Sequence, residues 1–170
     1  VISVNAQVKT KINGSFTAAT TATTIALENF LIPGDFSANA DIKDGKFSIE
    51  FDCKREDIFK LKFTQQNYAA LIIKPGDNIS VKLNPNALGS NPVIEGSEQS
   101  TRLYSIEFQL AKIKNSQDSL NTVYGTISPT DAVRKKQIED EYNLFEMQKN
   151  TLLYNIISAN KGDLVNMFFV

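Results

Sequence analysis

The sequence predicts an α+β protein in which an antiparallel β-sandwich or barrel of about seven to eight strands precedes a long antiparallel helical hairpin. Up to about Leu83, apolar residues alternate with polar ones, as in strands with one buried face. Turn residues separate these segments every eight to twelve residues or so, a spacing typical of sandwiches and barrels. From Ser97 onward the apolar steps change to three and four, as in helices. We therefore expect a sandwich domain over residues 7–95 and a helical region over residues 96–170.

The expected strands are short and share one pattern, an apolar residue at every second position. Asp44-Gly45 separates two of them, and this pair is typical of a tight hairpin because both turn residues must adopt positive φ. The alternating positions are Val8, Thr10 and Ile12; Ile25 and Leu27; Phe36, Ala38, Ala40 and Ile42; Phe47, Ile49 and Phe51; Phe59, Leu61 and Phe63; and Ile79, Val81 and Leu83, with a continuous apolar segment over residues 68–73.

Four phenylalanines fall on one face of these strands: Phe47, Phe51, Phe59 and Phe63. Burial of each would contribute roughly 1.5–3 kcal/mol, so we interpret them as core residues. The alternative is a row of aromatic rings that lines a ligand groove.

The first helix is expected to start at Ser97, whose side chain can cap the first turn while Glu98 favours the positive end of the helix dipole. Its apolar seam consists of Leu103, Ile106, Leu110, Ile113, Leu120 and Tyr124, interrupted by Gln117. Residues 125–129 break the pattern. Ser128 is the expected cap of a second helix, with Pro129 in its first turn.

The second helix has a seam of Ile138, Tyr142, Phe145, Leu152, Ile156 and Ala159, interrupted by Lys149. Val133, Leu144, Leu153 and Ile157 add apolar surface that the sandwich or a further element could cover. Asn160-Lys161-Gly162 is a stop signal, and Asp163 is the expected cap of a third helix. Because residues 164–170 are largely apolar, we expect the natural protein to continue past Val170.

Composition argues against an active site in these residues. The chain has no histidine, which excludes Ser-His and Cys-His catalysis and histidine metal sites. Cys53 is the single cysteine, and we interpret it as a small buried residue rather than a reactive thiol. We therefore identify no catalytic, cofactor-binding or metal-binding residues, and we expect no cofactor and no enzyme activity from the residues present.

Charge and hydropathy limit the classes of partner that the chain is expected to bind. Lys and Arg number 18 against 19 Asp and Glu, with both signs mixed along the chain, so nucleic acid is not an expected partner. No apolar segment approaches the roughly 20 residues that span a bilayer.

Near the N-terminus, Val4-Asn5-Ala6 is similar to a signal-peptidase site, which predicts export to the periplasm or cell envelope. The alternative is that Val1 to Val4 begins the first strand.

The remaining acidic motifs have structural explanations. Glu139, Asp140 and Glu141 are consecutive on a helix and so point in different directions, as on a solvated face. Asp41 and Asp44 flank the hairpin turn. The repeated Pro-Gly-Asp of residues 33–35 and 75–77 could suggest calcium, but each supplies one carboxylate and Pro-Gly is what a type II turn requires.

Several landmarks in order carry a family resemblance. They are Ile12-Asn13-Gly14, the segment from Ile42 to Ser48 around Asp44-Gly45, the segment from Lys74 to Ile79, and the segment from Ile94 to Glu98. Together they resemble the domain of unknown function found at the front of thioredoxin-like proteins of the TlpA/ResA type in Gram-negative gut bacteria. The resemblance implies thiol-disulfide chemistry in a C-terminal Cys-x-x-Cys domain, a motif that residues 1–170 do not contain.

Two functions follow as expectations. In the first, the chain is a non-catalytic accessory module of an exported thiol-disulfide oxidoreductase; it positions its own C-terminal redox domain or docks a protein partner through the helical hairpin, which could also form a homodimer. In the second, it is a stand-alone envelope module that binds a glycan, lipid or peptide without redox chemistry.

Overall fold

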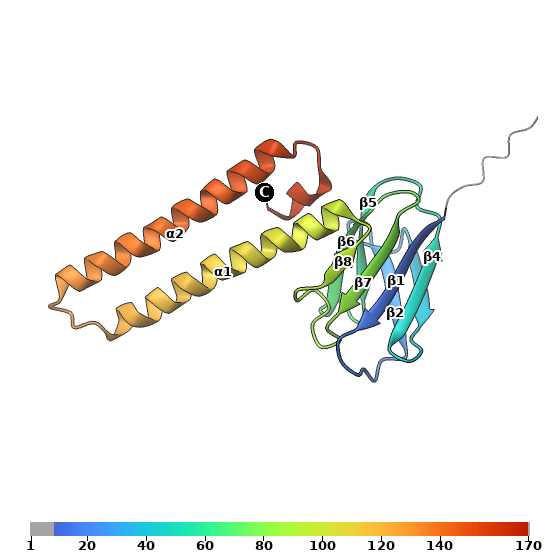
Figure 1. The fold of residues 1–170 in the computed structure, drawn as a ribbon, viewed down its shortest axis with the longest axis horizontal. Coiled ribbons are helices and arrows are strands. Elements are labelled where there is room, and N and C mark those ends of the chain that lie inside the picture. The colour runs from blue at the N-terminus through green and yellow to red at the C-terminus, as the bar shows by residue number, and fades with distance from the viewer. Residues whose placement is uncertain (1–8, 170) are drawn as a thin grey trace, which may run out of the picture. The chain divides into compact units, whose positions relative to one another are not determined.

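A computed structural model describes residues 9–169 of the chain (Figure 1). It contains eight strands, two long helices and one short 3₁₀ helix. The strands are β1 (Thr10–Phe16), β2 (Thr24–Asn29), β3 (Ser37–Asp41), β4 (Lys46–Phe51), β5 (Asp57–Lys62), β6 (Tyr68–Ile73), β7 (Asn78–Leu83) and β8 (Val93–Glu95). The helices are α1 (Glu98–Thr126), α2 (Ala132–Ala159) and the 3₁₀ helix η1 (Leu164–Phe168). The chain divides into two compact units, one that ends at Tyr104 and one that begins at Ser105.

The first unit is a β-sandwich of two four-stranded sheets, with strand orders β4-β1-β7-β8 and β3-β2-β5-β6. The predicted α+β class and sandwich are therefore confirmed, and the two sheets described do not close into a barrel. The short apolar pair Val93-Ile94 forms β8, which pairs with β7. The expectation that all strands are antiparallel is wrong at one place, because β1 and β7 run parallel. No tight turn joins these two strands, so nothing local fixes their relative direction.

The Asp44-Gly45 turn is confirmed, but its strands separate. Both residues have positive φ, 52° and 69°, and Lys43 and Lys46 exchange two backbone hydrogen bonds of 2.9 Å across the turn. Beyond that single bridge β3 pairs with β2 and β4 pairs with β1, in opposite sheets. The turn thus connects the two layers of the sandwich instead of extending one of them.

The sandwich core follows the predicted parity. Phe47, Phe51 and Phe59 are buried, whereas Phe63 lies just beyond β5 and is half-buried against the core. The buried core cluster also contains Ile12, Ile25, Leu27, Ile49, Leu61, Leu71, Ile73, Ile79, Val81, Leu83, Leu88 and Ile94. Aromatic contacts join the layers, since Phe51 of β4 lies 5.5 Å from Phe59 of β5, between ring centroids.

The outer edge of β6 is covered by side chains from the start of α1. The Ile72 amide donates to Ser100 Oγ (2.8 Å), and Ser97 Oγ donates to the Ile72 carbonyl (2.6 Å). The Tyr104 hydroxyl accepts from the Ala70 amide (2.8 Å) and donates to its carbonyl (3.1 Å). We call Ser97, Ser100 and Tyr104 the edge clasp. Their side chains satisfy backbone groups that an edge strand otherwise offers to another chain.

The edge clasp should contribute measurably to stability. In Ser100→Ala the buried Ile72 amide loses its acceptor, so we expect a loss of about 1–3 kcal/mol in the free energy of unfolding. Chemical denaturation measures the loss, and hydrogen exchange at Ile72 reports it locally. Ser105→Ala, which changes an exposed serine of the same helix, is the control; equal stability of the two variants would contradict this role.

The second unit contains the helical hairpin from Ser105 onward, while the start of α1 belongs to the first unit. Ser97 caps α1 as predicted, accepting from the Ser100 amide (3.2 Å). The predicted N-cap of α2 is wrong. The helix starts at Ala132, and its N-cap is Asp131 rather than Ser128, because the Asp131 carboxylate accepts from the Arg134 amide (2.9 Å). The Asp131 side chain therefore caps the first turn of α2, whereas the Ser128 hydroxyl lies 2.9 Å from Thr130 Oγ1.

The far end of α2 matches the predicted stop, since the helix ends at Ala159 and Gly162 has a φ of 91°. Asp163 occupies the N-cap position of the predicted third helix, which is the short 3₁₀ helix η1. Within this unit Ile138 and Val165 are buried, while most seam residues of both helices are only half-buried. Leu144 and Val133, which were expected to add apolar surface to the second helix, are 56% and 73% exposed.

Candidate functional site

The polar residues that interrupt the two helix seams meet at one carboxylate. Gln117 of α1 donates to Glu146 of α2 (2.8 Å), and Lys149 lies 2.7 Å from the same carboxylate. The exposed fractions of the Glu146 and Lys149 side chains are 34% and 36%. The sequence pattern marked Gln117 and Lys149 as interruptions but not Glu146, which sits one turn from Lys149 on α2. A pairing of this kind fixes the relative register of two helices.

A cavity of about 520 Å³ opens beside this polar group. Its apolar wall contains Leu110, Ala111, Leu153 and Phe169, the residue that follows η1. Lys114, Asp118 and Tyr142 complete the lining with the Gln117–Glu146–Lys149 group. The seam between the helices is therefore open enough to accept further apolar groups.

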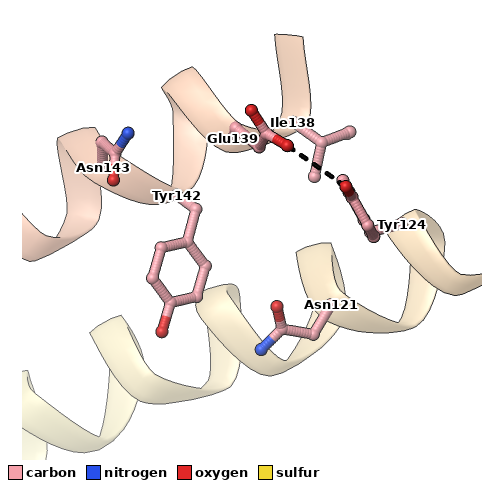
Figure 2. A pocket seen from close by; sticks show the side chains of 6 residues that line it. All are labelled: Asn121, Tyr124, Ile138, Glu139, Tyr142 and Asn143. Atoms are coloured by element: carbon pink, nitrogen blue, oxygen red, sulfur yellow. Dashed lines mark hydrogen bonds between the residues drawn. The ribbon is translucent and has the colours of Figure 1, made fainter. Parts of the chain in front are cut away.

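A second cavity, of about 370 Å³, lies nearer the hairpin loop (Figure 2). Asn121 and Tyr124 line it from α1, and Ile138, Glu139, Tyr142 and Asn143 line it from α2. The Tyr124 hydroxyl donates to Glu139 (3.1 Å), and this carboxylate raises the pKa of Tyr124. A tyrosine with a raised pKa keeps its proton at neutral pH, so the pair acts as a link between the helices rather than as a general base.

Hydrogen bonds from Lys149 and then Gln117 lower the pKa of Glu146. The unfolded chain therefore binds a proton at this carboxyl more tightly than the folded chain. The stabilisation is complete above the ordinary pKa of 4.5 and is lost as the pH falls through the lowered value. We expect Glu146→Gln to unfold more easily than wild type at neutral pH and to lose less stability between about pH 5 and pH 3.

Thermal unfolding monitored by circular dichroism at a series of pH values measures this difference. Asp118→Asn removes an exposed carboxylate of the same hairpin and serves as the control. If wild type and Glu146→Gln lose stability in parallel on acidification, Glu146 does not hold the helices together as described.

The sandwich has a cavity of about 440 Å³ at one end. Phe36, Phe51 and Phe59 form an aromatic wall, with ring centroids of Phe36 and Phe51 5.0 Å apart. The other lining residues are Asn29, Ile32, Asp35, Asp52, Cys53, Lys54, Arg55 and Asp57. Phe51 and Phe59 thus belong to the core and also reach a cavity wall, so the two interpretations of the phenylalanine row are compatible at this end.

Asn29 and Asp57 organise the rim of this cavity and were not singled out by the sequence pattern. The Asn29 side chain is buried; its oxygen accepts from the Leu31 and Ile32 amides (3.0 and 2.8 Å), and its nitrogen donates to Asp57 (3.1 Å). Arg55 lies 3.3 Å from Asp57 on the solvent side. The sequence signal for Asn29 is its position directly before an apolar loop with Pro-Gly, where Asn commonly bonds to backbone amides.

Cys53 is buried, as predicted, at the edge of the same cavity. Its Sγ donates to the Arg55 carbonyl (3.0 Å), and burial raises the pKa of the thiol. A thiol with a raised pKa supplies little thiolate, which is the reactive form. The geometry is that of a structural cysteine.

The acidic motifs lie in turns and on the exposed surface of α2, as the sequence predicts. Gly34 and Gly76 have φ of 92° and 83°, and each Pro-Gly turn is closed by the amide of the following Asp. Glu139, Asp140 and Glu141 are exposed. Over residues 9–169 no group of three or more His, Cys, Asp or Glu side chains is placed to hold a metal ion, and no helix has the length and hydropathy of a membrane span. The Val4-Asn5-Ala6 motif, Val8 and Val170 lie outside the described residues.

The fold thus defines a class of protein, a β-sandwich module with a helical hairpin after it. The family model described as "Domain of unknown function (DUF4369)" matches residues 10–103, and the chain belongs to this family. The match begins at β1 and ends one residue before the boundary of the first compact unit, so it contains Ser97 and Ser100 of the edge clasp. No curated protein and no solved structure matches the chain.

Proposed function

We propose that the chain is a non-catalytic accessory module of an exported thiol-disulfide oxidoreductase, which positions the redox domain of that protein or docks a partner through the helical hairpin. The observation that carries the proposal is the half-buried apolar seam of α1 and α2, with its open cavity beside Phe169. Apolar surface of this kind gains free energy when another element covers it. The redox context rests on the resemblance of the sequence landmarks to modules that precede TlpA/ResA-type domains, and the family match itself is to a domain of unknown function.

The properties of Cys53 support a division of labour between this module and a redox domain. A buried thiol with a raised pKa is poorly suited to attack a disulfide. In this proposal the module contributes position and partner choice, and the periplasm or cell envelope supplies the oxidising setting in which such proteins work.

The protein purified from its native host tests the proposal. Intact mass and peptide sequencing should show a Cys-x-x-Cys domain after Val170 and the removal of a signal peptide before the mature chain. Cys53→Ala in that protein should leave its disulfide-reductase activity unchanged, while Leu110→Lys, at the open seam, should impair turnover of its partner. A mature protein without a second cysteine would contradict the proposal.

A second function is favoured by the sandwich cavity with its three aromatic rings. We propose as the alternative a stand-alone envelope module that holds a glycan, lipid or peptide against Phe36. Thermal shift assays with soluble glycans, short peptides and lipid vesicles test it, with Phe36→Leu as the matched variant. A ligand that stabilises wild type but not Phe36→Leu supports binding in the cavity, and an unshifted midpoint across the panel counts against it.

A further inference from the structure

The exposed residues of α2 change from largely charged to uncharged at Tyr142. Before it, the exposed residues include Arg134, Lys136, Glu139, Asp140 and Glu141. After it, every exposed residue of the helix is uncharged: Asn143, Leu144, Met147, Gln148, Asn150, Thr151, Tyr154, Asn155, Ser158 and Ala159. The two charged residues in this part, Glu146 and Lys149, pair with each other on the half-buried side. We call residues 143–158 on this side the uncharged face.

Three large apolar side chains stand out on the uncharged face. Leu144, Met147 and Tyr154 are 56%, 65% and 71% exposed. They recur at steps of three and seven, so together with Thr151 they follow one stripe along the helix. The centre of a protein interface differs from ordinary surface by depletion of charged residues, and Met and Tyr are among the residues that it favours.

We infer that the uncharged face is a homodimer contact, in which α2 of one copy packs antiparallel against α2 of a second copy. A pairing centred on position 149 places Leu144 of each copy against Tyr154 of the other and Met147 against Thr151 of the other. Every large apolar residue of the face then meets an uncharged residue of the second copy. The segment that pairs symmetrically about position 149 is residues 143–155, so the charged residues before Tyr142 lie outside it and like-charge repulsion between copies is avoided.

The chemistry of the face favours a second copy over other occupants. A partner with a strong charge of either sign would find no countercharge here. A membrane-surface helix typically carries Lys and Arg beside its apolar stripe, and the uncharged face carries neither. The thirteen paired residues, 143–155, extend about 20 Å, and a single helix contact of this length buries less than the roughly 1,200 Å² of standard interfaces. We expect a weak dimer, with a dissociation constant in about the micromolar range.

Sedimentation velocity of the 170-residue chain from about 5 to 500 μM measures the association. We expect a concentration-dependent shift from monomer to dimer that is retained when salt is raised from about 50 to 500 mM, because no exposed charge takes part. Met147→Glu should keep the chain monomeric throughout. Val133→Glu, at a residue of the same helix that is similarly exposed but lies outside the uncharged face, should leave the dimer unchanged. Circular dichroism verifies that both variants are folded.

A covalent test fixes the register. In Leu144→Cys/Tyr154→Cys, mild oxidation should give a cross-linked dimer, while either single variant should cross-link at least about tenfold more slowly; Cys53 is buried and does not compete. A chain that stays monomeric over the whole range, a dimer that survives Met147→Glu, or binding to neutral lipid vesicles in place of self-association would overturn the inference. None of these outcomes bears on the redox context of the proposed function.

Discussion

Gly96→Ala should lower the free energy of unfolding by about 3 kcal/mol or more, the largest effect expected in this chain for replacing one hydrogen atom by a methyl group. Gly96 joins β8 to α1 and has a φ of 83°, which L residues rarely adopt. A Cβ here would lie 2.2 Å from the Asn78 carbonyl oxygen and 3.3 Å from the Ile79 Cα. Backbone atoms cannot rotate away, so β7 or the start of α1 must move.

Urea denaturation of Gly96→Ala measures this cost, and Gly34→Ala separates its two causes. Gly34 has a similar φ of 92° but no atom within 4 Å of its would-be Cβ, so it reports backbone strain alone. We expect Gly34→Ala to cost about 1 kcal/mol. Equal costs for the two variants would show that the close approach of Gly96 to β7 contributes nothing.

Phe47→Ala should cost about 3–5 kcal/mol, because it opens a cavity in the sandwich core. The Phe47 ring lies across Gly14, its partner on the neighbouring strand β1, and occupies the space of the missing side chain. A Cβ on residue 14 would lie 1.9 Å from the Phe47 Cζ. Gly14→Ala should therefore cost about 1–3 kcal/mol by displacing the ring.

A double-mutant cycle tests whether the ring and the glycine fit each other. In Gly14→Ala/Phe47→Ala the new methyl group enters space that the ring has left, so the double variant should be more stable than the sum of the single losses predicts. Ile79→Val, at another core position, should add to Gly14→Ala without such coupling. Strict additivity of Gly14→Ala and Phe47→Ala would contradict the packing described here.

Local patterns predicted the strands and helices well, because alternation and three-to-four spacing report which face of each element is buried. The pairing of strands within the sheets was harder to predict from the sequence. The parallel β1–β7 pair and the parting of β3 and β4 after Asp44-Gly45 depend on which layer each strand joins, and no turn residue encodes that. The edge clasp was visible only in part: Ser97 was predicted as a cap, but its bond to Ile72 requires the position of β6.

The candidate sites show the same limit. Gln117 and Lys149 were recognised as breaks in two seams, yet their common partner Glu146 lies off the predicted seam and only the hairpin geometry brings the three together. By contrast, the absence of histidine and the presence of a single cysteine can be read directly from the sequence, and they limit the catalytic chemistry available to the chain. They needed no knowledge of the fold.

Alkylation of Cys53 is the most direct test of the view that this module holds and positions rather than reacts. The folded chain is treated with iodoacetamide at about pH 8, and the rate is compared with that in denaturant. We predict that folding slows modification at least about 100-fold, since the thiol reacts only when the sandwich opens. Equal rates in the folded and unfolded chain would reveal an accessible thiolate and contradict the assignment of a purely structural cysteine.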